Sequence, residues 1–396
     1  MIFIESILNL WLFLLLFIGI TKYILLFCGY FVRASTSYPG VSNLRGQTSL
    51  PLYTILVPLF MEKCVDVVRL RKNIFKTEYS NFEVIYLCED VDILLLSFLK
   101  SEAVLPNERV MCIPKIPPFT KPKACNYGLE VARGEYVVIY DAEDNPHSLQ
   151  LLVAHYVLST TNYMCVQFPL EFVTDGTILS VWQFIDYLVW YKRLLPVCLK
   201  LNAPIPLGGT SNHFKVSELR KIGGWNAFNV TEDAELGLRI YSVQKSVAFV
   251  PMYKTKERSV KNILNLSNQR TRWVKGHFLT FLHFFLVNMV RGDLMGCLWV
   301  FFMLASYLFM CISYFSILLF VPNQLKSTSM ILMTFSICLF FVLPLLYIMA
   351  FKELRCKKYI VGVLFYPVYS IFYIIPVVKA LLECIFFPSF WYKTTR

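Results

Sequence analysis

The sequence predicts an α/β domain that is inserted between transmembrane helices. Two observations lead to this fold class. First, apolar runs alternate with a helical pattern in the middle of the chain, as in the strand–helix–strand units of parallel sheets. Second, charge is concentrated there: residues 34–293 hold 28 lysines and arginines and 23 acidic residues, whereas the other 136 residues hold 10 and 3. A globular middle is therefore flanked by very apolar ends.

The composition argues against several classes of protein. Of 396 residues, 57% are hydrophobic and 16% are charged, whereas soluble domains carry about 25% charged residues. Disordered, fibrous and ordinary soluble proteins do not fit. The net charge of +12 divides into +5 (28 − 23) for the middle and +7 (10 − 3) for the ends, without a run of five or more basic residues. This distribution favours a membrane and argues against nucleic acid as a partner. The 12 cysteines form no CxxC pair, which is typical of free thiols in a reducing compartment.

Four apolar stretches are long enough, or nearly so, to cross a bilayer, which takes about 20 residues. They are residues 7–32, 294–321, 329–351 and 359–378. The first lacks the basic start and the small-residue cleavage site of a signal peptide, so we expect an uncleaved N-terminal transmembrane anchor over residues 1–33. Lys22 within it is expected to snorkel to the interface or to face a partner helix. Lys379 is expected to end the fourth stretch.

Basic residues predict the orientation, because loops rich in lysine and arginine stay in the cytoplasm. Arg33 and Arg45 follow the first stretch, and four basic residues fill the loop between the third and the fourth. They predict a multi-pass cell membrane protein with a cytoplasmic domain at residues 34–275 and about three spans in residues 294–396. This count places the C-terminus outside although the tail is basic. Either the fourth segment lies partly in the membrane plane or the count is off by one.

Within the segment 276–293, residues 277–290 form an apolar run that is too short to span a bilayer, and Trp273, Lys275 and Arg291 flank this run. We expect an interfacial amphipathic helix that lies on the membrane surface. The alternative is a buried helix of the middle domain.

Within the middle domain, apolar runs at residues 53–57 and 82–88 enclose a helical pattern, which predicts a parallel strand–helix–strand unit. A third strand is expected at residues 136–140, after a helical stretch at residues 123–133. These elements make up the core of the predicted α/β sheet.

Acidic clusters follow two of these strands: Glu89 and Asp90 come after the second strand, and the segment DAED (141–144) comes after the third. Because ligands of open α/β sheets bind beyond the carboxyl ends of the strands, two such clusters predict a binding site. Asp141 and Glu143 can share Mg²⁺ or Mn²⁺ through their oxygens. The alternative is that these acids are ordinary turn and helix-cap carboxylates.

Two further segments carry chemistry. Thr231 and Asp233 precede a helical stretch, so Thr231 is expected to cap that helix, and Asp233 is either part of its first turn or a general base. In the segment QRTRW, the spacing of Gln269, Arg272 and Trp273 places them on one helical face. A guanidinium suits phosphate, and an indole suits stacking on a sugar ring. A basic, aromatic membrane anchor is the alternative.

The chain resembles the family 2 glycosyltransferases, in the cellulose synthase-like group of membrane-bound processive β-glycosyltransferases. The resemblance covers residues 50–290 and the membrane pattern, and its pieces come in the order of the family. They are VPLFME (57–62), LCEDVD (87–92), KPKACN (121–126), YDAED (140–144), GGTSNHF (208–214), GGWN and NVTEDAELGLR (223–239), QRTRWVKG (269–276) and the tail PSFWYKTT (388–395).

This resemblance implies a GT-A-type, Rossmann-like nucleotide-binding domain that inverts the configuration of the transferred sugar. Asp233 would deprotonate the acceptor hydroxyl. Asp141 would hold Mg²⁺ or Mn²⁺ on the donor diphosphate, with Glu143 in place of the second Asp of the family and Asp144 as the alternative ligand. The nucleotide-binding residues that it implies are Glu89, Asp90, Asp92, Lys121, Lys123, Gln269 and Arg272, with two registers open for the three acids. The acceptor-binding residues that it implies are Gly209, Thr210, Glu232 and Trp273.

The function implied is transfer of a sugar from a nucleotide-sugar donor to a growing polysaccharide, with export subunits as candidate partners. A second hypothesis is the transfer of a single sugar to a lipid carrier. A third, from another class, is a non-catalytic membrane receptor or scaffold that retained the fold. The segment QRTRW favours the first hypothesis, and the intact acids at all three sites argue against the third.

Overall fold

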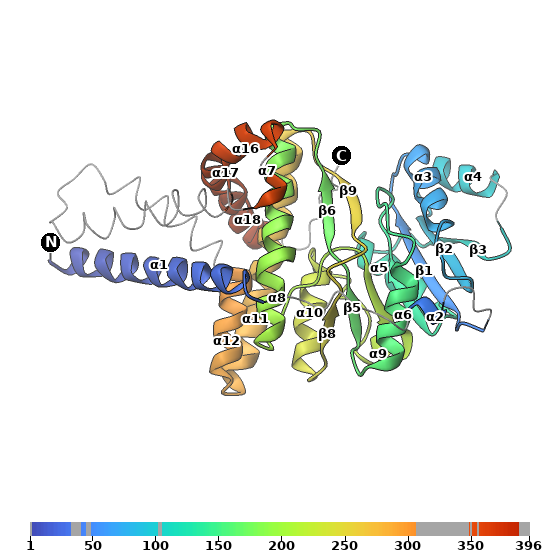
Figure 1. Cartoon of the computed structure of the whole chain (residues 1–396), viewed down its shortest axis with the longest axis horizontal. Helices are drawn as coiled ribbons and strands as arrows, with labels where there is room; N and C mark the ends of the chain where they lie inside the picture. The colour runs from blue at the N-terminus through green and yellow to red at the C-terminus, as the bar shows by residue number, and fades with distance from the viewer. Residues whose placement is uncertain are drawn as a thin grey trace. The chain divides into compact units, whose positions relative to one another are not determined.

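The structure is a computed structural model, and it describes residues 2–32, 41–44, 49–101, 105–305, 348, 351–354 and 356–387. The chain divides into two compact units, which are described separately (Figure 1). The sheet unit comprises Arg33–Phe172 and Pro204–Arg258. The helical unit comprises Met1–Val32, Val173–Ala203 and Ser259–Arg396.

The sheet unit is built on a seven-stranded sheet in the order β3-β2-β1-β4-β7-β5-β8. Its strands are β1 (Tyr53–Leu59), β2 (Phe82–Glu89), β3 (Glu108–Ile113), β4 (Tyr136–Ile139), β5 (Cys165–Gln167), β7 (Asn212–Lys215) and β8 (Val247–Phe249). Strands β3, β2, β1 and β4 are parallel to one another, which confirms the predicted parallel unit. Strand β7 runs antiparallel to β4 and β5, so the sheet is mixed, which the sequence did not predict. A second sheet pairs β6 (Leu170–Val173) with β9 (Thr255–Arg258).

Helices cover both faces of the sheet because its central strands are apolar on both faces. They are α2 (Val41–Leu44), α3 (Cys64–Ile74), α4 (Ile93–Ser101), α5 (Lys121–Val131), α6 (Gln150–Thr160), α9 (Val216–Lys221) and α10 (Glu232–Ser242). On one face, Ile55 and Val57 of β1 share a core with side chains of α3 and α6. On the other face, α5 approaches through Gly128, where a Cβ atom would lie 2.9 Å from the side chains of Leu56 and Leu87.

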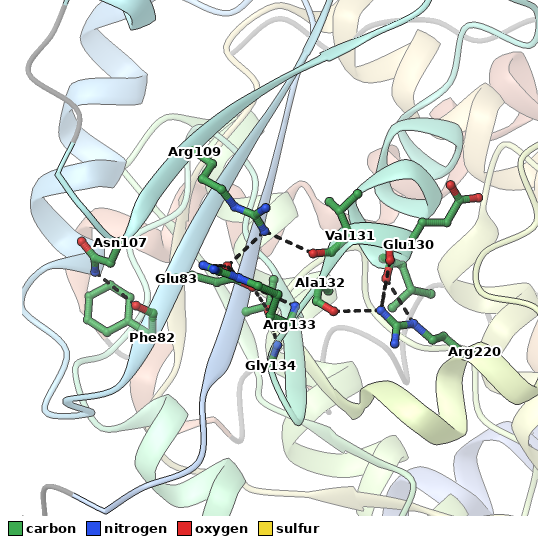
Figure 2. Close-up of polar contacts among 12 residues, drawn as sticks. Phe82, Glu83, Asn107, Arg109, Glu130, Val131, Ala132, Arg133, Gly134 and Arg220 are labelled. Atoms are coloured by element: carbon green, nitrogen blue, oxygen red, sulfur yellow. Dashed lines mark hydrogen bonds and ion pairs between the residues drawn. The ribbon is translucent and has the colours of Figure 1, made fainter.

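A buried carboxylate ties three strands and the end of α5 together (Figure 2). Glu83 of β2 accepts hydrogen bonds from Thr54 of β1 at 2.8 Å, from Arg109 of β3 at 3.0 Å, and from the backbone N–H and the guanidinium of Arg133 at 2.7–2.9 Å. Burial raises the pKa of Glu83, but these hydrogen bonds and charges outweigh burial and hold it below its ordinary value. Nearby, Arg220 donates to the carbonyl groups at the end of α5.

The helical unit contains the segments that the sequence assigns to the membrane. Its helices are α1 (Ile2–Cys28), α7 (Ile178–Val189), η1 (Trp190–Leu194), α8 (Leu195–Lys200), α11 (Ile263–Val290), α12 (Leu294–Val300), η2 (Phe301–Ala305), η4 (Lys352–Leu354), η5 (Lys357–Tyr359), α16 (Ile360–Leu364), α17 (Tyr366–Phe372) and α18 (Ile374–Phe386). Among the described residues, Tyr366–Phe386 is the helix whose length and apolar composition suit a membrane span, and Leu16–Cys28 and Leu294–Ala305 are shorter apolar helices.

The predicted spans meet the structure in different ways. The first falls on α1, and the charge of Lys22 within it acts on Asp186 of α7. The second begins on α12 and η2, but its remainder, almost all of the third span and the tail 388–395 lie outside the described residues. The fourth, which ends in the sequence just before Lys379, falls mainly on α16, α17 and α18, and α18 continues past Lys379 to Phe386. Lys379 is accommodated inside it because its ammonium group bonds Asn268 Oδ1 at 2.7 Å.

Up to residue 290, the predicted interfacial segment 276–293 does not form a helix of its own. It is the second half of α11, which runs without a break from Ile263 to Val290 and also carries QRTRW. Leu286 and Val290 on this half are 61% and 89% exposed, whereas Phe281 and Phe284 are buried. The segment therefore has one apolar face inside the helical unit and another that is exposed.

We predict that Glu83→Gln destabilises the protein by about 1–3 kcal/mol at pH 7, because the donors around this buried position lose a charged acceptor. The pKa of Glu83 is lowered in the native state. Its contribution to the free energy of unfolding is therefore complete above the unfolded-state pKa of about 4.3, and it is lost as the pH falls through the native pKa. Denaturant unfolding of both proteins at several pH values measures this difference. Glu130→Gln, an exposed site on α5, is the control. A difference that persists undiminished at low pH would contradict this account.

Candidate active site

The two acidic clusters of the sequence lie at one edge of the sheet. Strand β1 lies between β2 and β4, and all three run parallel, so their carboxyl ends meet at this edge. Glu89 is the last residue of β2, and Asp141 comes two residues after Ile139, the last residue of β4. The expectation that both clusters share an edge is confirmed.

Lys121, the first residue of α5, links this edge to two other predicted segments. Its Nζ lies 2.5 Å from Asp141 Oδ1 and donates to the carbonyl oxygen of Gly209 at 2.7 Å. Burial lowers the pKa of Lys121, but the carboxylates of Asp141 and Glu232 outweigh burial and raise it above its ordinary value. The side chain therefore stays charged between the acid after β4, the loop before β7 and the start of α10.

Asp233 lies in the first turn of α10, close to the same loop. A Cβ atom on Gly209 would be 3.3 Å from Asp233 Oδ2. Helix α10 reaches this position because Gly237 lets it approach the preceding segment: a Cβ there would be 2.1 Å from the carbonyl oxygen of Ile205. The Thr231 side chain makes no capping bond and instead donates to Asn229 Oδ1 at 3.3 Å. The prediction that Thr231 caps the helix through its side chain is wrong, because its hydroxyl is directed to the preceding turn.

Asp144 is turned into the protein. It is 1% exposed, and its Oδ2 accepts from the Asp141 backbone N–H at 2.8 Å and contacts Thr210 Oγ1 at 2.5 Å. Burial, then the charges of Glu257, Asp141 and Glu143, raises the pKa of Asp144 well above its ordinary value. Asp144 thus braces the loop, and Asp141 and Glu143 are the partly exposed acids of this segment.

The acids present fit one kind of metal site. In the part of the chain that the structure describes, no cluster of three or more His, Cys, Asp or Glu side chains could enclose a metal ion. Two carboxylates at a strand end suit a Mg²⁺ or Mn²⁺ ion that takes its other ligands from water and from substrate phosphates. Asp141 has 28% of its side chain exposed, and its present cationic neighbour is Lys121.

The three acids after β2 have different environments. Glu89 is buried and pairs with Lys123 at 3.1 Å, and the same ammonium group donates to the carbonyl oxygens of Pro114 and Ile116, each at 3.1 Å. Burial raises the pKa of Glu89, and Lys123 partly offsets this shift. The Lys123 side chain is therefore directed inward.

The other two acids lie nearer the surface. Asp92 accepts from the Met61 N–H at 2.7 Å and from the Leu95 N–H at 3.3 Å, so it joins the turn after β1 to the start of α4. Asp90 is exposed and accepts one hydrogen bond, from the Lys115 N–H at 3.2 Å. Of the three, Asp90 is the acid in an exposed position.

The segment QRTRW lies in the helical unit, within α11, so the expected helix is confirmed. Gln269 is 1% exposed, and its amide atoms have no hydrogen-bond partner among the described residues. Arg272 and Trp273 are half-buried. Sequence reasoning passed over Arg270, which is fully buried with its guanidinium 4.1 Å from the centre of the Trp273 ring. The i, i+3 spacing of Arg270 and Trp273 on a helix is the signal that could have found this contact.

Comparison with known proteins identifies the family. A family model described as "Glycosyltransferase like family 2" matches residues 51–276, which is more than half of the chain. The chain belongs to this family. It is a glycosyltransferase, an enzyme that transfers a sugar from a nucleotide-sugar donor, so the hypothesis of a non-catalytic scaffold is wrong.

Two curated relatives and one solved structure are similar to this glycosyltransferase. The probable glycosyltransferase YdaM of Bacillus subtilis is 25% identical over 303 residues, 70% of each chain. The beta-monoglucosyldiacylglycerol synthase of a Nostoc species is 23% identical over 260 residues, which span 63% of this chain and 53% of the relative. The mannosyltransferase PcManGT of Pyrobaculum calidifontis, solved with GDP-Man and Mn²⁺, matches with a TM-score of 0.62 at 15% identity over 96% of this chain and 98% of that one. This last similarity supports the α/β, GT-A-like fold.

Proposed function

We propose that this glycosyltransferase works at a membrane and transfers a sugar, with inversion, from a nucleotide-sugar donor to a lipid-linked acceptor. One observation carries the proposal. Asp141, Lys121, Gly209 and Asp233, which come from four separate segments, converge at the carboxyl edge of the sheet. A leaving diphosphate and an attacking hydroxyl need such a combination of acids and a cation in one place.

Each residue has a proposed part in the transfer. Asp141 and Glu143 hold Mg²⁺ or Mn²⁺, which supplies neutralising charge for the leaving diphosphate when it is bound. Lys121 adds a positive charge beside Asp141. Asp233 accepts the proton of the acceptor hydroxyl, from the face of the sugar opposite the leaving group. Asp90 is exposed and contacts the nucleoside, whereas Glu89 and Lys123 brace the end of β2.

The helical unit supports the membrane location. Large apolar side chains are exposed on α11, α12, α16, α17 and α18, as expected for a surface that contacts lipid. Examples are Leu286, Val290, Leu294, Ile375 and Ile385. A cytoplasmic catalytic domain and more than one span are part of this proposal, on the basis of the basic loops and apolar stretches of the sequence.

Two considerations bear on the acceptor. A relative that acts, by its name, as a beta-monoglucosyldiacylglycerol synthase favours a membrane lipid. Helix α11 carries both QRTRW and exposed apolar residues, so an acceptor bound at Trp273 could keep its lipid part in the membrane. A growing polysaccharide is the second candidate. It is favoured because Gln269 and Arg272, proposed to contact the diphosphate, lie on the same helix as Trp273, proposed to contact a sugar.

Asp233→Asn is expected to lower turnover by about 10²–10⁴-fold, because a positioned base is lost, while donor affinity changes little. Turnover is measured as nucleotide release, and donor affinity by equilibrium binding. Glu130→Gln is the matched control, since it neutralises an exposed acid of the same unit. Near-normal turnover of Asp233→Asn would mean that Asp233 is only part of the first turn of α10 and is not the general base.

We expect activity to require Mg²⁺ or Mn²⁺ and to disappear with excess chelator. Asp141→Ala is expected to weaken the binding of Mn²⁺, followed directly by its paramagnetic signal, and to lower activity in parallel. Asp144→Asn neutralises an inward-facing acid whose two hydrogen bonds an amide oxygen can also accept, so it is expected to change Mn²⁺ affinity much less than Asp141→Ala does. Full turnover in chelator would remove the metal from this proposal.

The acceptor is tested with protein in membranes, a panel of nucleotide-sugars, and three acceptors. These are vesicles with diacylglycerol, vesicles with glucosylated diacylglycerol, and a soluble oligosaccharide. We expect nucleotide release and a product of one added sugar with a vesicle-borne acceptor. A long polymer would favour the second candidate, and transfer to the soluble oligosaccharide alone would overturn the lipid-linked acceptor.

A further inference from the structure

Arg270 lies inside QRTRW and is completely buried in the helical unit. Arginine is almost never fully buried unless it is paired. Its partner is Asp186 of α7, whose Oδ2 accepts from Arg270 Nη2 at 2.8 Å. The guanidinium Nε donates to the hydroxyl of Tyr369 on α17 at 3.0 Å. Two other helices therefore hold this one side chain of α11.

The acceptor groups are themselves fixed. The Tyr369 hydroxyl donates to Asp186 Oδ2 at 2.8 Å, and the Tyr366 hydroxyl donates to Asp186 Oδ1 at 2.9 Å. The Tyr369 ring stacks on Trp182 with a centroid distance of 4.9 Å and an interplanar angle of 18°. A guanidinium is planar, so bonds at both Nε and Nη2 fix the plane as well as the position.

The fixed guanidinium lies against Trp273. Its Cζ is 4.1 Å from the centre of the indole ring, a distance typical of a cation–π contact. Arg270 Nη1 has no hydrogen-bond partner among the described residues, so the cluster does not satisfy every donor of the guanidinium. The cluster of Asp186 and Tyr369 therefore orients the guanidinium without satisfying all of its hydrogen-bond donors.

We propose that Arg270, held by Asp186 and Tyr369, is a positioning residue that sets the plane of the Trp273 indole before the acceptor binds. The inference rests on the proposed acceptor role of Trp273. A ring that is already oriented loses less conformational freedom on binding, so the acceptor binds more tightly at the same contact area. Arg272, three residues after Gln269, keeps its separate proposed role toward the diphosphate.

The experiment uses the full-length protein in membranes and the variants Arg270→Lys and Tyr369→Phe. Lysine keeps the charge but has no planar group to hold an indole, and phenylalanine keeps the ring of Tyr369 but not its hydroxyl. Glu383→Gln is the matched control, because Glu383 pairs with the buried Lys275 of the same helix at 3.1 Å. Each variant is also made in combination with Trp273→Phe.

Two readouts separate positioning from stability. The first readout is the near-UV circular dichroism signal of Trp273. It is obtained by subtracting the spectrum of the Trp273→Phe form from that of each protein, and it does not depend on activity or on the acceptor. The Michaelis constants for donor and acceptor are measured with vesicles of glucosylated diacylglycerol. We expect Arg270→Lys to weaken the Trp273 signal and to raise the acceptor KM about tenfold, because the indole loses the planar group that orients it before binding, with an unchanged donor KM. Tyr369→Phe should also weaken the Trp273 signal and raise the acceptor KM.

The combined variants decide the question. If Arg270 acts through Trp273, Arg270→Lys adds little to the acceptor KM of Trp273→Phe, since coupled residues are not additive. Glu383→Gln is expected to lower the thermal midpoint without changing the Trp273 signal. An Arg270→Lys protein with a lower thermal midpoint but a normal Trp273 signal would overturn the inference. Without transfer to the lipid, the proposed function fails, but the Trp273 signal still tests the positioning role.

Discussion

The candidate active site depends on the interactions of the Lys121 ammonium group. A buried charge is costly unless it is paired, so its position is determined by the groups that surround it. Lys121 contacts Asp141 and the Gly209 carbonyl, and it also experiences the charge of Glu232. One side chain therefore holds the start of α5, the end of β4 and the loop before β7 within a few ångströms, with the start of α10 nearby.

The acids around this site divide by burial into two groups. Glu89 and Asp144 are buried and bond to Lys123 and Thr210, so they shape the ends of β2 and β4. Asp141 and Glu143 are partly exposed, and these oxygens are the ones available to a metal or a substrate. Buried acids that fix the loops and partly exposed acids are thus neighbours in the sequence. Lys121 holds Asp141, so the fold also positions a partly exposed acid of this segment.

Part of this fold could be predicted from sequence and part could not. Strands β1, β2 and β4 were predicted because apolar runs at residues 53–57, 82–88 and 136–140 are long enough to form a pattern. Strands β5 and β8 have three residues each, too few for a pattern, and the antiparallel β7 depends on pairing with residues far away in the chain. The same limit applies to the site. Spacing placed Asp141 beside Asp144, but only packing against Thr210 turns Asp144 inward. The sequence does not show that α18 continues past Lys379, because its partner Asn268 lies in another element.

The segment QRTRW shows how one short motif can hold two arginines with different physical roles. Residues 270 and 272 are two positions apart, so on a helix they point in directions about 200° apart. Arg270 faces α7 and α17, where its charge is balanced by Asp186, and Arg272 is half-buried on a different side. Trp273, three residues after Arg270, lies on the same side of α11 as the guanidinium, so that contact follows from helix geometry once Arg270 is buried. The spacing that links Gln269, Arg272 and Trp273 is therefore only half of the motif, and the other half is the buried arginine beside the indole.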